Sequence, residues 1–255
     1  KFQVMSVFEQ KYSSIYESIY KTKDYQGEAK CVEKILSSHP FEVKKILSFG
    51  CGTGNHDFIL AENGFQIIGV DRSKQMLSLA ISKKRTDNPT FLHVDDFDMI
   101  ENHSMDASVC LFDVFSYFTN SNEITEFFDL INEKSKSQTL LIFDFWYLPS
   151  VIHLKPETRK KHFIKGKTEI TRICEPSLDV SNSCVKATHS FFLKDEDRID
   201  SFSETHQMRC FTKNELCRIL DNHGFELKSL GTWNNPHLDP TLNDWSALAV
   251  AAKIT

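Results

Sequence analysis

Ile46-Leu47-Ser48-Phe49-Gly50-Cys51-Gly52-Thr53-Gly54-Asn55-His56 is the most informative stretch of the chain. It predicts a short apolar strand over residues 45–49, a glycine-rich turn, and a helix that runs to about residue 63. Glycines in such a turn let backbone amides approach a ligand closely. A tight strand–helix connection without a ligand gives the same pattern. A dinucleotide site needs the spacing G-x-G-x-x-G, whereas the spacing here is G-x-G-x-G.

Strands and helices alternate after this turn. Further strands are predicted over residues 66–70, 90–94, 107–112 and 139–145, and helices over residues 73–85 and 123–132. Residues 6–37 are also expected to be helical. Strands that alternate with helices of this length predict an α/β protein with a parallel, doubly wound sheet.

The alternation stops after Pro149. Strand-like runs follow over residues 169–174, 184–193 and 201–210, and no convincing helix separates them. We therefore expect an antiparallel sheet inserted after the fifth strand. A capping-box pattern at residues 212–215 then opens a helix, and residues 225–230 and 246–252 are the last two strands. The predicted division is N-terminal helices and core over 1–149, inserted sheet over 150–210, and remaining core over 211–255.

Acidic residues follow the second and third predicted strands. Asp71 ends the second strand, where a carboxylate can accept hydrogen bonds from both hydroxyls of a ribose. An acid facing a helix dipole is the alternative, although Ser73 can already cap that helix. Asp95-Asp96-Phe97 follows the third strand, and one of its two aspartates can simply be solvated. Ligands of open α/β sheets bind at the carboxyl ends of the strands. The glycine turn and these acidic residues all follow such strand ends, so together they predict one binding site.

Together these motifs resemble those of class I methyltransferases, which use S-adenosylmethionine (SAM) and release S-adenosylhomocysteine. The resemblance implies a Rossmann-like, seven-stranded sheet whose last strand is antiparallel. It also implies that the glycine loop packs against the amino-acid part and ribose of SAM, that Asp71 binds the ribose, and that an acid at Asp95 binds the adenine amino group. The cofactor-binding residues expected on this basis are Tyr25, Gly50, Cys51, Gly52, Gly54, Asp71, Arg72, Met76, Asp95, Asp96, Phe97 and Phe112.

Ser48 departs from the family pattern, because most members carry Asp or Glu at this position. That acid commonly orients the loop and the ammonium group of the methionine part. A serine can form hydrogen bonds but supplies no charge. Two consequences are open: backbone carbonyls near Gly50 bind the amine, or SAM binds more weakly.

A closer resemblance, to nucleotide-linked amino-sugar N-methyltransferases, extends over most of the chain. It rests on residues 12–28, 112–117, 145–149 and 201–212. It implies methylation of a small molecule, with a nucleotide-linked amino sugar as the leading acceptor. An O-methyltransferase, an N-methyltransferase of another metabolite and a non-catalytic SAM-binding protein are the alternatives. The glycine spacing argues against a nicotinamide-dependent oxidoreductase.

Aromatic side chains and one strand pair are the candidates for the acceptor site. Tyr16, Tyr25, Tyr117 and Trp146 can hold the sulfonium and its methyl group, because cations favour π faces; core packing is the alternative for each. Glu204 and His206 alternate along a strand and should share one face. His206 is then a base or a substrate anchor, and a strand pair without chemistry is the alternative. The predicted catalytic residues are His206, Tyr16 and Tyr117; the predicted substrate-binding residues are Tyr16, Tyr117, Trp146, Glu204 and His206.

Composition limits the partners. The net charge of −5 argues against a nucleic-acid substrate, and Arg159-Lys160-Lys161 is expected to be a solvated loop. No apolar stretch is long enough to span a bilayer, so no membrane partner is expected. The odd number of cysteines, seven, fits reduced thiols in a cytoplasmic protein. No metal-ligand spacing occurs, and we expect no metal. Either a monomer or a homodimer is compatible with the sequence.

Overall fold

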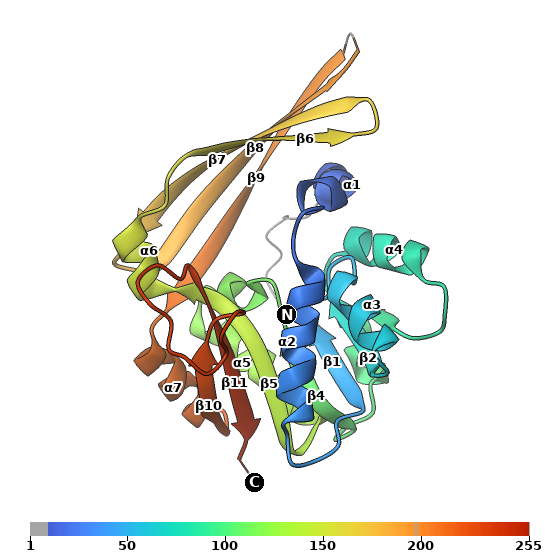
Figure 1. Cartoon of the computed structure of the whole chain (residues 1–255), viewed down its shortest axis with the longest axis vertical. Coiled ribbons are helices and arrows are strands. Elements are labelled where there is room, and N and C mark those ends of the chain that lie inside the picture. The colour runs from blue at the N-terminus through green and yellow to red at the C-terminus, as the bar shows by residue number, and fades with distance from the viewer. Residues whose placement is uncertain (1–9, 197, 255) are drawn as a thin grey trace.

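The computed structural model describes residues 10–196 and 198–254, and its centre is a seven-stranded mixed sheet (Figure 1). The strand order is β3-β2-β1-β4-β5, continued by β11 and β10. The first five strands are mutually parallel, whereas β11 is antiparallel to both of its neighbours. The bounds are β1 Lys45–Phe49, β2 Gln66–Asp71, β3 Thr90–His93, β4 Met105–Cys110, β5 Ser135–Tyr147, β10 Phe225–Gly231 and β11 Ser246–Lys253. The predicted fold class, including the antiparallel last strand, is confirmed.

Helices cover both faces of this sheet, and the alternation of side chains along each strand explains why. Phe143 and Phe145 of β5 enter one apolar cluster, whereas Leu140 and Ile142 enter another. Strands buried on both faces need such double cover. One face packs against α2 Tyr25–Ser37 and α3 Asn55–Glu62, and the opposite face packs against α5 Ser121–Lys134 and α7 Lys213–Asn222. Outside these clusters α4 Lys74–Lys83 packs its buried Leu77 and Ala80 against Phe91 of β3.

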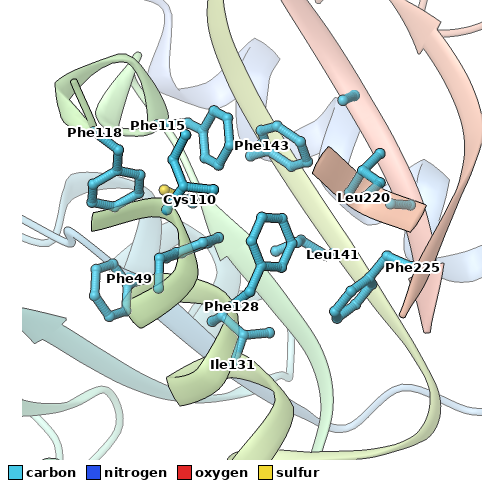
Figure 2. Packing of buried hydrophobic residues seen from close by; sticks show 14 of the residues in the cluster. Phe49, Cys110, Phe115, Phe118, Phe128, Ile131, Leu141, Phe143, Leu220 and Phe225 are labelled. Atoms are coloured by element: carbon cyan, nitrogen blue, oxygen red, sulfur yellow. The ribbon is translucent and has the colours of Figure 1, made fainter. Parts of the chain in front are cut away.

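Phenylalanine rings fill the cluster beneath α5, which accounts for many of the 21 phenylalanines (Figure 2). Phe115 lies in η2 Val114–Tyr117 and is fully buried. Its ring centroid is 4.5 Å from that of Phe143 and 5.0 Å from that of Phe211. The other short 3-10 helix, η1 Val94–Met99, buries Phe97 in the same cluster.

After β5 the chain forms α6 Leu148–Leu154 and four antiparallel strands, which lie beyond one end of the core (Figure 1). They are β6 Arg159–Lys165, β7 Thr168–Asp179, β8 Cys184–Asp195 and β9 Arg198–Phe211, and each pairs with the next. The end of β9 runs parallel to the end of β5, at Trp146 and Tyr147, beyond the last residue at which β4 pairs with β5. The division of the chain at residues 150 and 210 stays a prediction.

Three expectations of local structure were wrong. Helix α6 was not foreseen, although Pro149 lies in its first turn, where proline is well tolerated. Arg159-Lys160-Lys161 is the start of β6 and not a loop. The N-terminal helical segment is interrupted between α1 Gln10–Ile19 and α2, where the Asp24 side chain accepts a hydrogen bond from Gly27 N. Residues 6–9 of that prediction lie outside the described residues.

Helix α1 connects the four-stranded sheet to the core. Lys11 forms an ion pair of 2.8 Å with Asp200 of β9, and Lys165 of β6 donates to the Ser14 carbonyl at 2.7 Å. On its other side Glu17 accepts a hydrogen bond of 2.9 Å from Lys83 of α4. Surface ion pairs contribute little to stability individually, but together these contacts set where α1 lies. Among the described residues, no helix is long and apolar enough to cross a membrane.

We expect Phe115→Ala to lower the free energy of unfolding by about 3–5 kcal/mol, because it leaves a cavity among rings that cannot collapse into it. Chemical denaturation measures the change. The matched control is Phe41→Ala, at a side chain that is 58% exposed, and it should change stability by less than about 0.5 kcal/mol. Equal effects of the two substitutions would contradict the packing described above.

Candidate active site

A cavity of about 610 Å³ opens at the carboxyl ends of β1, β2 and β4 and continues beneath the four-stranded sheet. Ligand sites of open α/β sheets occur at this edge, and pockets of this size hold a small molecule. One end is formed by the glycine loop and the strand ends. Alternate residues of β6–β9 form the other end: Arg159, Lys161, Arg172, Cys174, Pro176, Val185, Ala187, His189, His206 and Met208.

The glycine loop can be built only from residues that tolerate left-handed backbone. Gly50, Gly52 and Gly54 have φ of +72°, +57° and +75°. A Cβ on Gly50 would lie 2.5 Å from Val114, and one on Gly54 would lie 2.5 Å from Phe91, so both positions also exclude a side chain on packing grounds. The space around Gly52 is open, and this glycine lines the cavity together with Gly50 and Cys51. Gly54 does not line it and instead begins α3 against Phe91.

Asp71 lies on the cavity wall and holds the loop in place. Its two carboxylate oxygens accept backbone hydrogen bonds of 2.8 Å, one from Gly52 N and one from Ser73 N. Burial raises the pKa of Asp71, and these backbone donors offset part of the rise. Ser73 caps α4 by accepting from Met76 N at 3.2 Å. Asp71 therefore supports the loop and also lies on the cavity wall, whereas the cap of α4 is Ser73. Binding of a ribose stays a prediction.

The acidic residues after β3 are farther from the cavity than expected. Val94 lines it, whereas Asp95, Asp96 and Phe97 do not. The Asp95 side chain is 79% exposed and lies 3.2 Å from the ring of His93. Phe97 was expected at the cofactor but points into the core, because the 3-10 turn rotates it towards Phe49. Contact of Asp95 or Asp96 with adenine stays a prediction.

Aromatic side chains form the wall between the two ends of the cavity. The rings of Tyr16 and Tyr20 have centroids 4.8 Å apart, and the ring of Phe112 is 5.0 Å from that of Tyr20. Burial raises the pKa of Tyr16, so its hydroxyl stays protonated at neutral pH. The predicted residues Tyr16, Tyr25, Arg72, Met76, Phe112, Tyr117 and Trp146 all line this cavity, and so do Tyr12 and Tyr20, which were not predicted.

The turn after β4 carries backbone strain beside the cavity. Phe112 and Asp113 have φ of +70° and +58°. The turn is held because Ser246 donates to the Asp113 carboxylate at 2.8 Å and Asp113 N donates to Asp144 at 3.1 Å. Burial raises the pKa of both carboxyl groups. Strained backbone of this kind concentrates at functional sites, where the surrounding structure enforces it.

Tyr117 and His206 meet at the cavity across a long sequence separation. A hydrogen bond of 2.7 Å joins the Tyr117 hydroxyl to Nδ1 of His206. Nε2 of His206 lies 3.6 Å from the carboxylate of Glu204, which is buried on the same face of β9 but does not line the cavity. Burial, with the positive charges of Arg172 and Arg72, lowers the pKa of His206 to about 3. The imidazole is therefore neutral at physiological pH and a weak base.

Two groups of functional interest were missed in the sequence. Arg172 and His189 line the cavity from β7 and β8, and only the strand pairing shows that they face it. Asp57 lines the cavity from the first turn of α3, directly after the quoted motif. His56 is the last residue of the quoted stretch, and its ring binds Glu28 at 2.7 Å, while Glu28 pairs in turn with Lys23.

Known proteins are similar to this chain in sequence and in fold. Residues 46–135 match the family model described as a methyltransferase domain. YqeM of Bacillus subtilis (strain 168), which is named for an unproven methyltransferase activity, is 29% identical over 86% of each chain. The dTDP-3-amino-3,6-dideoxy-alpha-D-glucopyranose N,N-dimethyltransferase of Streptomyces fradiae is 21% identical over 85% of this chain and 84% of its own. The X-ray structure of the sugar N-methyltransferase KedS8, from a Streptoalloteichus species, superposes with a TM-score of 0.80 at 19% identity, over 100% of this chain and 99% of that one.

The sheet order and the glycine loop at its carboxyl edge define the class I methyltransferase fold. Residues 46–135 therefore form a methyltransferase domain, and SAM is its cofactor. The cavity offers residues that fit the cofactor, namely the open backbone at Gly52 and the carboxylate of Asp71. When bound, SAM supplies an activated methyl group.

We expect Asp71→Ala to weaken SAM binding at least tenfold, because it removes a charged acceptor, worth about 1.5–3 kcal/mol per hydrogen bond, and also frees Gly52. Isothermal titration measures the affinity, and circular dichroism checks the fold. The matched control is Asp98→Ala, at an exposed acid of η1 that does not line the cavity. An unchanged affinity in Asp71→Ala would remove Asp71 from the cofactor site, and an equal loss in Asp98→Ala would show a general effect of charge.

Proposed function

We propose that this enzyme transfers the methyl group of SAM to the amine of a nucleotide-linked amino sugar. The observation that carries the proposal is the positive charge at the sheet end of the cavity. Arg159, Lys161 and Arg172 line that end, with Glu157 as the acid beside them. A nucleotide-linked sugar carries a diphosphate, which such cations bind. The names of the Streptomyces relative and of KedS8 agree with a sugar amine as the acceptor.

Strand register strengthens the argument from charge. Lys161 of β6 and Arg172 of β7 are direct cross-strand partners. Like charges placed opposite each other on one face of a sheet destabilise it. Neither side chain forms a salt bridge with any residue in the described part of the chain. Arg172 is instead 5.5 Å from the ring of Phe163 and 6.0 Å from that of Tyr20. An anionic substrate group would remove this repulsion.

The aromatic wall between the two ends suits methyl transfer. The reaction needs a neutral amine in line with the sulfonium methyl, and water must be kept away. Tyr16, Tyr20 and Phe112 offer aromatic rings to a positively charged sulfur and methyl group. Helix α1 and the four-stranded sheet close this part of the cavity and exclude water.

His206 and Tyr117 are assigned to positioning the acceptor and not to proton transfer. With its pKa lowered to about 3, His206 does not take a proton from an ammonium group near neutral pH. It fixes the Tyr117 hydroxyl through their 2.7 Å hydrogen bond. The acceptor amine loses its proton to solvent before it is methylated. The proposal includes a cytoplasmic enzyme, since its substrate is a soluble metabolite.

The direct test is turnover with a panel of acceptors. Purified enzyme and SAM are incubated with dTDP-linked 3-amino sugars, the same sugars without the nucleotide, and hydroxylated sugars on dTDP. We expect methylated product with the nucleotide-linked amine, detected by mass spectrometry. Methylation of the free amino sugar with equal efficiency would contradict the role of the diphosphate, and methylation of the hydroxylated sugars alone would make the enzyme an O-methyltransferase.

Lys161→Gln and Arg172→Gln should each raise the KM for the nucleotide-linked acceptor about tenfold or more, because each removes a charged donor to the diphosphate. The affinity for SAM, measured by titration, should stay the same. Lys160→Gln is the matched control, since Lys160 lies between two cavity residues on β6 but does not line the cavity itself. A KM that rises equally in all three variants would show a general charge effect in place of a site.

We expect His206→Ala to lower kcat/KM for the acceptor by about tenfold, the loss of a neutral contact, and not by the 10²–10⁴-fold typical of a lost general base. Because its pKa is about 3, His206 is neutral throughout pH 6–9, so the pH profile of the variant should keep the wild-type shape. Tyr117→Phe should lower kcat/KM by about the same factor. The double variant should lower it only slightly further, since the two residues act together. A much larger loss with rescue at high pH would show that His206 is the base.

A further inference from the structure

Asp57 is a buried carboxylate with unused hydrogen-bonding capacity at the cofactor end of the cavity. It lies in the first turn of α3, is 1% exposed and lines the cavity. Neither of its carboxylate oxygens has a hydrogen-bond partner with regular geometry among the residues that the structure describes. Buried acids are almost always paired or hydrogen-bonded, because an isolated buried charge is costly. The position therefore calls for a partner that is not part of the chain.

Ser48 lies within hydrogen-bonding reach of Asp57, but among the described residues no cation forms an ion pair with it. The neighbours of Asp57 are Ser48 on β1, Cys51 in the loop, Asp71 on β2 and Lys83 on α4. Ser48 lies close enough to favour the charged form, whereas the negative charge of Asp71 opposes it. The lysine is already engaged, since its Nζ donates to Glu17 at 2.9 Å and to Asn55 at 2.7 Å. Burial, with the charge of Asp71, raises the pKa of Asp57 to about 7.

A cationic group of the ligand fits this position. SAM carries two positive centres, the sulfonium and the α-ammonium group. The ammonium is a hydrogen-bond donor, which the carboxylate needs, whereas the sulfonium has no N–H or O–H. We propose that the Asp57 carboxylate binds the α-ammonium group of SAM and so supplies the negative charge that Ser48 cannot. The inference rests on SAM as cofactor and is independent of the acceptor.

The buried Asp57 carboxylate lowers the stability of the free enzyme and raises its affinity for SAM. In the free protein the carboxylate pays the cost of burial without a partner, and binding of an ammonium group removes that cost. A ligand that binds only the folded state stabilises it by mass action.

Titration of Asp57→Asn with three ligands tests the contact. SAM and S-adenosylhomocysteine both carry the ammonium, whereas 5′-methylthioadenosine lacks the amino-acid part. We expect Asp57→Asn to weaken the first two at least tenfold, as for a lost charge-assisted hydrogen bond, and to leave the third unchanged. Weakening of SAM alone would assign Asp57 to the sulfonium, and equal weakening of all three would show a general effect on the loop; either result overturns the proposal.

Two control variants sharpen the result. Glu62→Gln removes an exposed carboxylate at the other end of α3, outside the cavity, and should leave all three affinities unchanged. Ser48→Asp combined with Asp57→Asn moves the carboxylate from α3 to the adjacent strand end. This double variant should recover most of the lost SAM affinity. Failure to recover, in a variant with native circular dichroism, would show that position 57 acts other than by supplying charge.

Proton release gives a readout that is independent of affinity. At pH 6 the α-ammonium group of SAM is charged, and Asp57, with a pKa of about 7, is mostly protonated in the free enzyme. Binding of the ammonium should lower this pKa and release close to one proton. Titration in two buffers of different ionisation enthalpy measures the proton. We expect release in the wild type and none in Asp57→Asn, and equal release in both would overturn the proposal.

Thermal stability of the free enzyme separates binding from a structural role. Because the folded-state pKa of Asp57 is raised to about 7, ionisation of this group destabilises the fold increasingly as the pH rises from its unfolded pKa, about 3.9, to about 7, and the loss is complete above that pH. Ligand-free Asp57→Asn should therefore have a higher Tm than the wild type at pH 8, and the difference should shrink towards pH 5. A lower Tm at pH 8 would mean that Asp57 supports the fold, which contradicts the proposal.

Discussion

The turn between β1 and α3 is fixed by three hydrogen bonds to the neighbouring strand. Gly50 N and Cys51 N both donate to the Val70 carbonyl, and Gly52 N donates to the Asp71 carboxylate. These bonds are possible only because the glycines adopt positive φ, which other residues rarely do. The loop therefore presents open backbone to the cavity, and the cofactor end of the site depends on this one constraint.

Burial shifts the pKa of two polar groups at the cavity, Asp57 and His206. Asp57 is desolvated, and its pKa is raised to about 7 by burial and by the charge of Asp71. His206 is desolvated next to positive charge, and its pKa falls to about 3. The raised pKa of Asp57 is a cost that the folded protein carries at neutral pH before a ligand arrives, whereas the neutral His206 carries such a cost only below about pH 6.5. Such costs are typical of sites whose groups are placed for binding and not for stability.

The acceptor end is assembled from parts of the chain that are far apart. Helix α1 is tied to β6 and β9 on one side and to α4 on the other, so it covers the aromatic wall. Because side chains alternate along β6–β9, one face of that sheet lines the cavity and brings its cations together. The same alternation places Tyr117 against His206, although they are 89 positions apart.

The sequence by itself determined the core. Apolar strands, capped helices and the spacing of Gly50, Gly52 and Gly54 are local signals, and the predicted fold class and cofactor follow from them. Pairing between distant segments is not a local signal, so only the tertiary structure decided which strand residues face the cavity. It placed the exposed residues Arg159 and Lys161 on a strand that lines the cavity, where a loop was expected, and it buried Phe97 in the core. Asp57 was overlooked for the same reason. An acid in the first turn of a helix is expected at the surface, and Asp57 is buried only because α3 packs against β1.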